Sequence, residues 1–352
     1  DEYWRFTDPQ AVTANVAEAA GFAAPHLTAE TSAHVEIIPL SQALKSDQSW
    51  VTDVYGQIEA TAHTPVRRPL AALVAAFATD GQAIRVTGDG GQLVIDHAAR
   101  QTAALSHSVI TVEAGASLTL IEIGAPPSGA LTLIEADLAD GASLHHIRLQ
   151  DAAQTGVSHV FVRIGANATY QGFTLGAQGK ALRNESVLTL AGAAGRAHIA
   201  AAWIGQGDAH HDDTVFITHA APHCESRQVF RSVLGRGAVT AFQGKILVEQ
   251  IAQKTDGYQL SQALLLDEDA QFLGKPELEI YADDVKCSHG STTGSIDETS
   301  LYYLRSRGVP ERQARHLLVL AFLNGTLDEV ADPALRDMLE TRISALSEAY
   351  LA

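Results

Sequence analysis

The tetrapeptide GASL occurs at residues 115–118 and again at residues 141–144, and GANA at 165–168 and GAVT at 237–240 resemble it. The first three copies begin 26 and then 24 residues apart. Each copy opens a short apolar stretch bounded by Gly, Asp or Asn, which is typical of β-strands joined by turns. A loose repeat of this length is also the pattern of a solenoid, in which each coil stacks on the next.

Short strands are predicted throughout residues 81–284. Val160, Val162 and Ile164, for example, occupy every second position, which is the period of a half-buried strand. No amphipathic segment of helical length separates the strands, so a sheet of alternating strands and helices is disfavoured. Two mainly β architectures stay open on periodicity alone: a parallel β-helix (solenoid), and an antiparallel sandwich or barrel with ordinary glycine turns.

Helical patterns precede this region. Asp8 is placed to cap a helix that begins at Pro9 and runs to Gly21, and Ser41 to cap a second helix. Residues 69–77 predict a short Ala-rich helix.

Helical patterns also follow the strands. Ser295 and Glu298 fit a capping box, and Pro310 and Pro333 stand at the start of two further amphipathic segments. We therefore predict an N-terminal helical domain at residues 1–80, a β core at 81–290 and a C-terminal helical domain at 291–352.

Composition restricts the class of protein. The chain has 352 residues, of which 46% are hydrophobic and 18% charged, which argues against disorder. Its net charge of −17 argues against nucleic acid or an anionic membrane as the main partner. Two cysteines, Cys224 and Cys287, cannot form a disulfide framework and fit a reducing cytoplasm. No apolar run approaches the length of a membrane span.

Cys287 and His289 form the most compact pair of candidate chemical groups. On a strand, positions i and i+2 point to the same face, so a thiol and an imidazole two residues apart can reach one metal ion. A stable zinc site needs four ligands, however, and no second motif is adjacent. From these residues alone, a buried thiol and a turn histidine are the favoured alternative.

A second cluster is rich in metal-type ligands but matches no defined zinc spacing. In a strand, His211 and Asp213 would lie on one side and His210 and Asp212 on the other. We expect polar residues at a turn between strands rather than a metal site. The cluster continues with His219, His223 and Cys224.

Several common enzyme motifs are absent from the sequence. It contains no Walker A motif, no G-x-G-x-x-G after a strand, no G-x-S-x-G and no H-E-x-x-H. The chain is therefore not an obvious ATPase, dehydrogenase, hydrolase or zincin.

Four strings closely resemble the SufB/SufD family of iron–sulfur cluster assembly proteins. They are GAVTAFQGKILV (237–248), AQKTDGYQ (252–259), KPELEIYADDVKCSHG (275–290) and LYYLRSRG (301–308). The third string looks like the SufD branch rather than the SufB branch. The likeness is strong over residues 233–322 and weaker at residues 2–7 and 71–77.

The resemblance implies a right-handed parallel β-helix flanked by helical domains, which makes the solenoid the leading fold. It also implies a scaffold subunit, not an enzyme, that pairs edge to edge with a SufB-like β-helix. The C-terminal helices would dock a SufC-like ATPase. The docking residues that we expect are Leu301, Tyr302, Leu304, Arg305, Leu317, Leu318 and Phe322.

In this family a nascent cluster forms between a SufB cysteine and a SufD histidine. The matching positions here are His289 and, less firmly, Cys287. The chain would bind no cofactor stably by itself and would hold a transient iron–sulfur cluster at the interface with SufB. A ligand histidine must be neutral, and Asp283 or Asp284 is a candidate to orient its other nitrogen.

Two other function classes stay open. One is a β-helix carbohydrate-processing enzyme that uses carboxylates such as Asp212 and Asp213. The other is a homodimeric binding module without cluster chemistry. Activity on acidic polysaccharides would distinguish the first class. Copurification with SufB-like and SufC-like subunits would separate the second from the scaffold.

Overall fold

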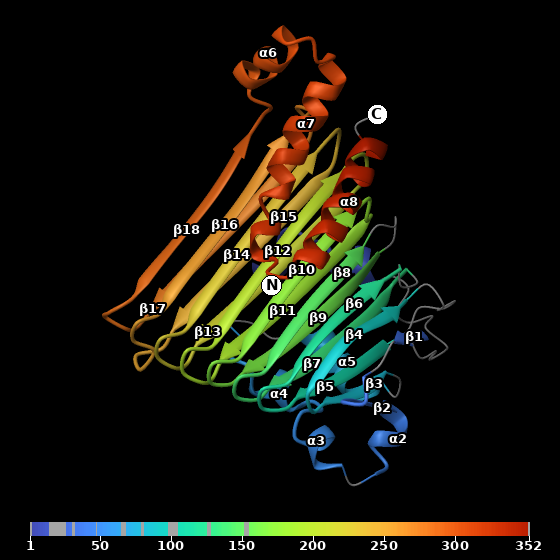
Figure 1. Ribbon diagram of the computed structural model, residues 1–352, viewed down its shortest axis with the longest axis vertical. Coiled ribbons are helices and arrows are strands. Elements are labelled where there is room, and N and C mark those ends of the chain that lie inside the picture. The colour runs from blue at the N-terminus through green and yellow to red at the C-terminus, as the bar shows by residue number, and fades with distance from the viewer. Residues whose placement is uncertain are drawn as a thin grey trace.

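Two nine-stranded sheets face each other in the computed structural model and form its core (Figure 1). The structure describes residues 2–13, 26–29, 32–46, 48–64, 68–78, 81–97, 105–124, 128–150 and 155–350. Sheet A contains, in spatial order, β1 (His26–Ala29), β4 (Asp89–Asp96), β6 (Ser117–Ile123), β8 (Ser143–Gln150), β10 (Thr169–Ala177), β12 (Arg196–Gly205), β14 (Glu225–Leu234), β16 (Asp256–Leu265) and β18 (Lys286–Gly294). Sheet B contains β17 (Gln271–Ile280), β15 (Val239–Val248), β13 (His210–His219), β11 (Ala181–Leu190), β9 (Thr155–Ile164), β7 (Ala130–Leu138), β5 (Leu105–Val112), β3 (Gln82–Val86) and β2 (Val35–Pro39).

From β3 onward, successive strands alternate between the two sheets, and neighbours within each sheet are parallel. The chain therefore coils, and each coil adds one strand to each sheet. This confirms the predicted parallel β-solenoid with helices at both ends, and the antiparallel sandwich is wrong. Among the strands that the structure describes, only β1 on β4 and β2 on β3 pair antiparallel.

One stack of turns explains the repeat in the sequence. In each of these turns, one residue has a positive φ, and its N–H donates to a carbonyl of the next coil, as Gly115 does to Asp140 at 3.0 Å. The third member is Asn167, 26 residues after Gly141, and not Gly165, so the repeat of the fold differs here from the spacing of the tetrapeptides. The stack contains Gly115, Gly141, Asn167, Ala194, His223 and Lys254.

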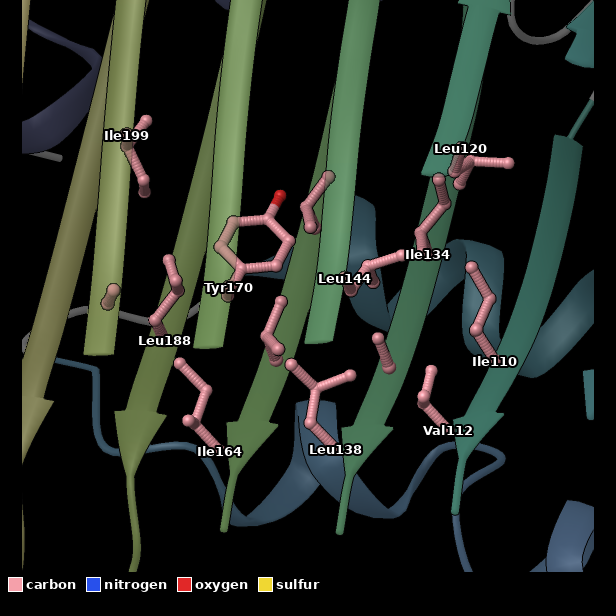
Figure 2. Close-up of a cluster of buried hydrophobic side chains, with 14 of the residues drawn as sticks. Ile110, Val112, Leu120, Ile134, Leu138, Leu144, Ile164, Tyr170, Leu188 and Ile199 are labelled. Carbon is pink, nitrogen blue, oxygen red and sulfur yellow. The ribbon is translucent and has the colours of Figure 1, made fainter. Parts of the chain in front are cut away.

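The space between the sheets is filled mainly by apolar side chains in its N-terminal part. Ile110, Leu138, Ile164 and Leu188 of sheet B point toward Tyr170 and the other inward residues of sheet A (Figure 2). Their burial away from water is the main driving force for stacking the coils.

The outer face of sheet B is covered by the N-terminal segment. Apolar residues of this segment, such as Leu40 and Val74, pack on outward side chains such as Phe161. The elements are η1 (Glu2–Trp4), α1 (Pro9–Thr13), α2 (Leu40–Ala43), α3 (Ser49–Thr52), α4 (Gln57–Thr61) and α5 (Pro69–Phe77).

The outer face of sheet A is covered by C-terminal helices, and α7 and α8 lie across β10, β12 and β14 (Figure 1). Phe173 and Val229 of the sheet pack with Val319 and Leu339 of these helices. The elements are α6 (Glu298–Ser306), α7 (Glu311–Asn324), η3 (Leu327–Glu329) and α8 (Pro333–Tyr350).

The N-terminal helix predictions were correct in part. The Asp8 carboxylate accepts from the N–H of Gln10 at 2.9 Å as α1 begins, but the rest of that predicted helix lies outside the described residues. Helix α5 has its predicted bounds. The helix predicted from Ser41 is two short helices, and the expected all-helical segment also contributes β1 and β2.

At the C-terminal end, one cap was misplaced. Strand β18 extends to Gly294, and Asp297 rather than Ser295 caps α6, accepting from the N–H of Ser300 at 2.8 Å. The helices expected after Pro310 and Pro333 are α7 and α8. None of the described helices is long and apolar enough to span a membrane.

Candidate functional site

The C-terminal end of the solenoid is formed by β17 and β18, which have nine or ten residues each. No described strand pairs with the outer edge of either one. Most residues of β18 are exposed and most of β17 are half-buried, whereas β13 is buried almost throughout. An edge of this length presents a row of free backbone N–H and C=O groups that another chain can pair with.

Cys287 and His289 both lie on β18 and share its inner face. Cys287 is in register with Gly257 and His289 with Gln259, a residue of β16 that is fully buried inside the solenoid. In-register neighbours on parallel strands point to the same face. The structure therefore places the thiol and the imidazole on one face, as the spacing predicted.

The two side chains differ in environment. Cys287 is half-buried and packs beside Ile246 and Val248, and burial raises the pKa of its thiol. A methyl group on Gly257 would lie 3.3 Å from Cys287 Sγ, so the sulfur sits closely over that glycine. His289 is exposed at the open end. The imidazole is thus the more accessible of the two candidate ligands.

The predicted orienting role of Asp283 or Asp284 was wrong. The carboxylate of Asp284 forms an ion pair with Lys254 in the turn before β18. Asp284 lies in the bend before β18, five positions before His289, and its backbone N–H donates to the side chain of Gln253 at 2.9 Å. The exposed Asp283 is farther still along the chain, and neither carboxylate contacts the ring.

The cluster His210–Asp213 lies at the start of β13, not in a turn, so that expectation was wrong. The predicted division between two faces is correct. The ring of His211 stacks on Trp203 inside the solenoid, with centroids 4.0 Å apart, and Asp213 accepts from the indole N–H of Trp203.

Burial determines the ionisation of these interior groups. It lowers the pKa of His211 to about 3 and raises the pKa of Asp213 to about 6. The Nε2 atom of His211 accepts from the backbone N–H of Gly179 at 3.1 Å, which requires the neutral ring. His211 is therefore a neutral structural side chain.

On the outer face of the same strand, Asp212 joins a buried ionic network. Arg183 forms ion pairs with Asp212 and Glu185, and Arg68 pairs with Glu185 at 2.5 Å. The hydroxyl of Thr7 also donates to Asp212. These contacts fasten the N-terminal segment to sheet B, so Asp212 and Asp213 are not a pair of exposed catalytic acids.

The remaining members of the second cluster are structural as well. His219 Nε2 lies 2.9 Å from the Ser226 hydroxyl, and burial lowers its pKa to about 4. His223 has a positive φ in the turn stack, and the buried Cys224 thiol donates to the Gly192 carbonyl. No three His, Cys, Asp or Glu side chains in the described part of the chain converge as a metal site.

Sequence reasoning missed a buried group on sheet A. The carboxylate of Glu122 lies 2.7 Å from His97 Nε2 and 2.6 Å from His146 Nε2, and the His146 ring lies 3.1 Å from the Tyr170 hydroxyl. The pKa of Glu122 is lowered by its hydrogen bonds to the two histidines, against the effect of burial. These residues lie about 25 positions apart, so only the coil register brings them together.

The predicted docking residues fall into two groups. Leu301, Leu304, Leu318 and Phe322 belong to the apolar cluster that the C-terminal helices share with sheet A. The others face solvent: Tyr302 is 75% exposed and Leu317 42% exposed, and Arg305 forms a surface ion pair with Glu311 at 3.2 Å. The sequence did not single out Tyr303, which is also exposed.

The family model for the core domain of SufBD, which belongs to the SUF system of iron–sulfur cluster assembly, matches residues 94–322. The chain belongs to this family. The match includes β18 with Cys287 and His289, and most of α6 and α7.

Two of the curated relatives that the chain matches are SufD proteins. The chain is 34% identical over 213 residues to the iron–sulfur cluster assembly protein SufD of Escherichia coli, covering 59% of this chain and 49% of that protein. It is 28% identical over 248 residues to SufD of Bacillus subtilis, covering 68% and 56%. A SufBD family protein of Mycobacterium tuberculosis is 29% identical over 277 residues, covering 74% and 66%. Each match spans less than two thirds of the relative's own length.

Proposed function

We propose that this SufBD family member is a non-catalytic, SufD-like scaffold subunit for iron–sulfur cluster assembly. In this proposal it pairs with a SufB-like subunit through the open end of the solenoid and docks a SufC-like ATPase on its C-terminal helices. One observation supports it above the rest: His289 lies on the inner face of the unpaired edge strand β18, exposed where a second chain would meet it.

The open end supports pairing with a similar solenoid. Strands β17 and β18 offer two long edges of opposite sheets, and a partner β-helix ends in two edges of the same kind. The same edges would serve a homodimer when the partner is absent.

The cluster is cargo in this proposal and not a resident cofactor. Imidazole and thiolate are usual ligands for iron in such clusters. His289 supplies the ligand from this chain, and the SufB-like subunit supplies the remaining ones. Cys287 is the weaker candidate because burial raises its thiol pKa, although iron would displace the proton.

The ATPase would dock on the exposed side of α6 and α7. Tyr302, Tyr303 and Leu317 are large apolar or aromatic side chains that face solvent there. Aromatic side chains are enriched at the energetic centres of interfaces. The proposal includes a cytoplasmic location, which is supported by the two unpaired cysteines.

Copurification tests the proposal. The tagged chain is coexpressed with SufB-like and SufC-like subunits, and the complex is reconstituted anaerobically with iron and sulfide. We expect all three subunits to elute together, and His289→Ala to retain the complex but lose cluster assembly in a complementation assay. Ser288→Ala, on the opposite face of β18, is the matched control and should remain active.

Two results would overturn the proposal. One is a chain that elutes alone under these conditions. The other is full complementation by His289→Ala, which would remove the shared ligand.

A further inference from the structure

Arg148 is a buried cation that forms no ion pair with the residues that the structure describes. It lies on the inner face of β8 and is only 6% exposed. Its guanidinium donates to the hydroxyl of Ser158 at 3.2 Å and to the amide oxygen of Asn184 at 3.3 Å, two long hydrogen bonds to neutral groups. Burying a charge without a counter-charge costs free energy, so this arginine calls for an explanation.

The carboxylates around Arg148 are committed to other groups. Glu122 is in register with Arg148 on the adjacent strand β6. One of its oxygens lies 2.6 Å from His146 Nε2 and the other 2.7 Å from His97 Nε2. Asp213, across the interior, accepts from an indole and an amide N–H. Neither carboxylate is in direct contact with the guanidinium.

Three polar side chains of sheet B form a row on the other side of the guanidinium. Thr132 on β7, Ser158 on β9 and Asn184 on β11 are in register, so all three point into the solenoid. Two amide hydrogen bonds with Gln150, each of 3.1 Å, fix Asn184 with its oxygen toward Arg148. The hydroxyls of Thr132 and Ser158 donate to no other group in the described part of the chain, so both protons are available to an acceptor.

These side chains line a cavity of about 40 Å³ between the two sheets. One water molecule needs roughly 10–15 Å³ of such space, so about three waters or one small ligand fit there. Apolar residues, among them Ala130 and Leu182, form much of the remaining wall. A mostly apolar wall with a few converging polar groups is typical of a ligand site.

We propose that this cavity binds one small oxyanion, a short carboxylate or bicarbonate, as the counter-ion of Arg148. The guanidinium uses only Nη1 for Ser158 and Asn184, so its Nε and Nη2 N–H groups remain for the ligand. This edge of the guanidinium matches a planar oxyanion in bidentate geometry. The hydroxyls of Ser158 and Thr132 donate to the same ligand. The site lies away from β18 and does not rest on the proposed function.

NMR of the Arg148 Nε–H group in the full chain, without partners, tests the proposal. The arginines are labelled with ¹⁵N, and Arg148→Lys identifies the Arg148 signal by its loss. Sodium acetate and sodium bicarbonate are titrated separately, with the ionic strength held constant by sodium chloride. We expect the Arg148 signal to shift and saturate with at least one of the two anions. The anion that saturates it distinguishes an organic carboxylate from bicarbonate as the ligand.

Three further variants locate the binding site. Ser158→Ala and Thr132→Val each remove one hydroxyl donor and should raise the anion concentration at half saturation about tenfold, the effect of one hydrogen bond to a charged group. Ser232→Ala removes a buried, inward-facing hydroxyl of β14 and should leave that concentration unchanged. Because Thr132 makes no hydrogen bond to Arg148, Thr132→Val tests the ligand contact without disturbing the guanidinium.

A signal that does not saturate with either anion would overturn the assignment. So would an unchanged half-saturation concentration in Thr132→Val, or an equal increase in Ser232→Ala.

Discussion

The two ends of the solenoid are built differently. At the N-terminal end, the outermost strands β1 and β2 are four and five residues long and pair antiparallel with the coil beneath. At the C-terminal end, β17 and β18 are ten and nine residues long, run parallel to the coil beneath and have no described strand at their outer edges. Short, reversed strands blunt an edge against association, whereas long regular strands leave it available. The contrast supports the proposal that the C-terminal end, and not the N-terminal end, is the interface.

The largest expected difference between the ends is in stability. Ile84→Ala on β3 removes a fully buried side chain and should lower the free energy of unfolding by about 2–5 kcal/mol. Leu278→Ala on β17 removes a half-buried side chain and should cost less than about 2 kcal/mol in the chain alone. Chemical denaturation of both variants measures this. Equal losses would mean that the open end is as well packed as the other.

A second contrast concerns how the stability of the fold changes at low pH. Burial lowers the folded-state pKa of His211 to about 3 and of His219 to about 4. Unfolded histidines take up protons below about pH 6.5, so each of these groups destabilises the fold increasingly as the pH falls from there toward its folded value. At pH 5 the loss is at most about 2 kcal/mol for each. Asp213, whose folded pKa is raised to about 6, opposes this, because the folded state binds its proton more tightly.

Substitution separates these contributions. His211→Gln should reduce the loss of unfolding free energy between pH 7 and pH 5 by up to about 2 kcal/mol. Ser288→Ala, which removes no ionisable group, should leave that loss unchanged. Denaturation curves at both pH values test this, and identical behaviour of the two variants would contradict the assignment of His211 as a buried neutral ring.

The smallest expected effect on stability is on the helices beside the open end. Tyr302→Asp changes an exposed side chain and should alter the free energy of unfolding by less than about 0.5 kcal/mol. It should nevertheless weaken copurification of the SufC-like ATPase. Glu298→Gln, at an exposed position of the same helix, is the control. Deleting residues 296–352 is a poorer test, because it uncovers Phe173 and Val229 of the core.

The sequence predicted the solenoid because some of its turns contain glycines that recur at the spacing of the coils. Gly115 and Gly141 adopt the left-handed conformation that favours glycine, and both are visible in the sequence as the first residue of a GASL tetrapeptide. Asn167, Ala194, His223 and Lys254 take the same conformation without glycine, and the coils lengthen from 26 residues to 31 between the first and last pairs of the stack. The repeat therefore fades in the sequence although it persists in the structure.

The candidate site was predictable only in part. The string around Cys287 and His289 is local and could be recognised. The pairing of Gln259 with His289 depends on the register between coils 30 residues apart, which no local pattern encodes. The same is true of Glu122 with His97 and His146, because a polar contact between coils produces no periodic pattern in the sequence.

Hydrogen exchange of the chain, alone and bound to a SufB-like subunit, tests the central claim most directly. Backbone amides of β17 and β18 should exchange more slowly in the bound state, while those of β2 and β3 should not change. Protection confined to β2 and β3, or none at β17 and β18, would contradict the account of the open end as the assembly interface.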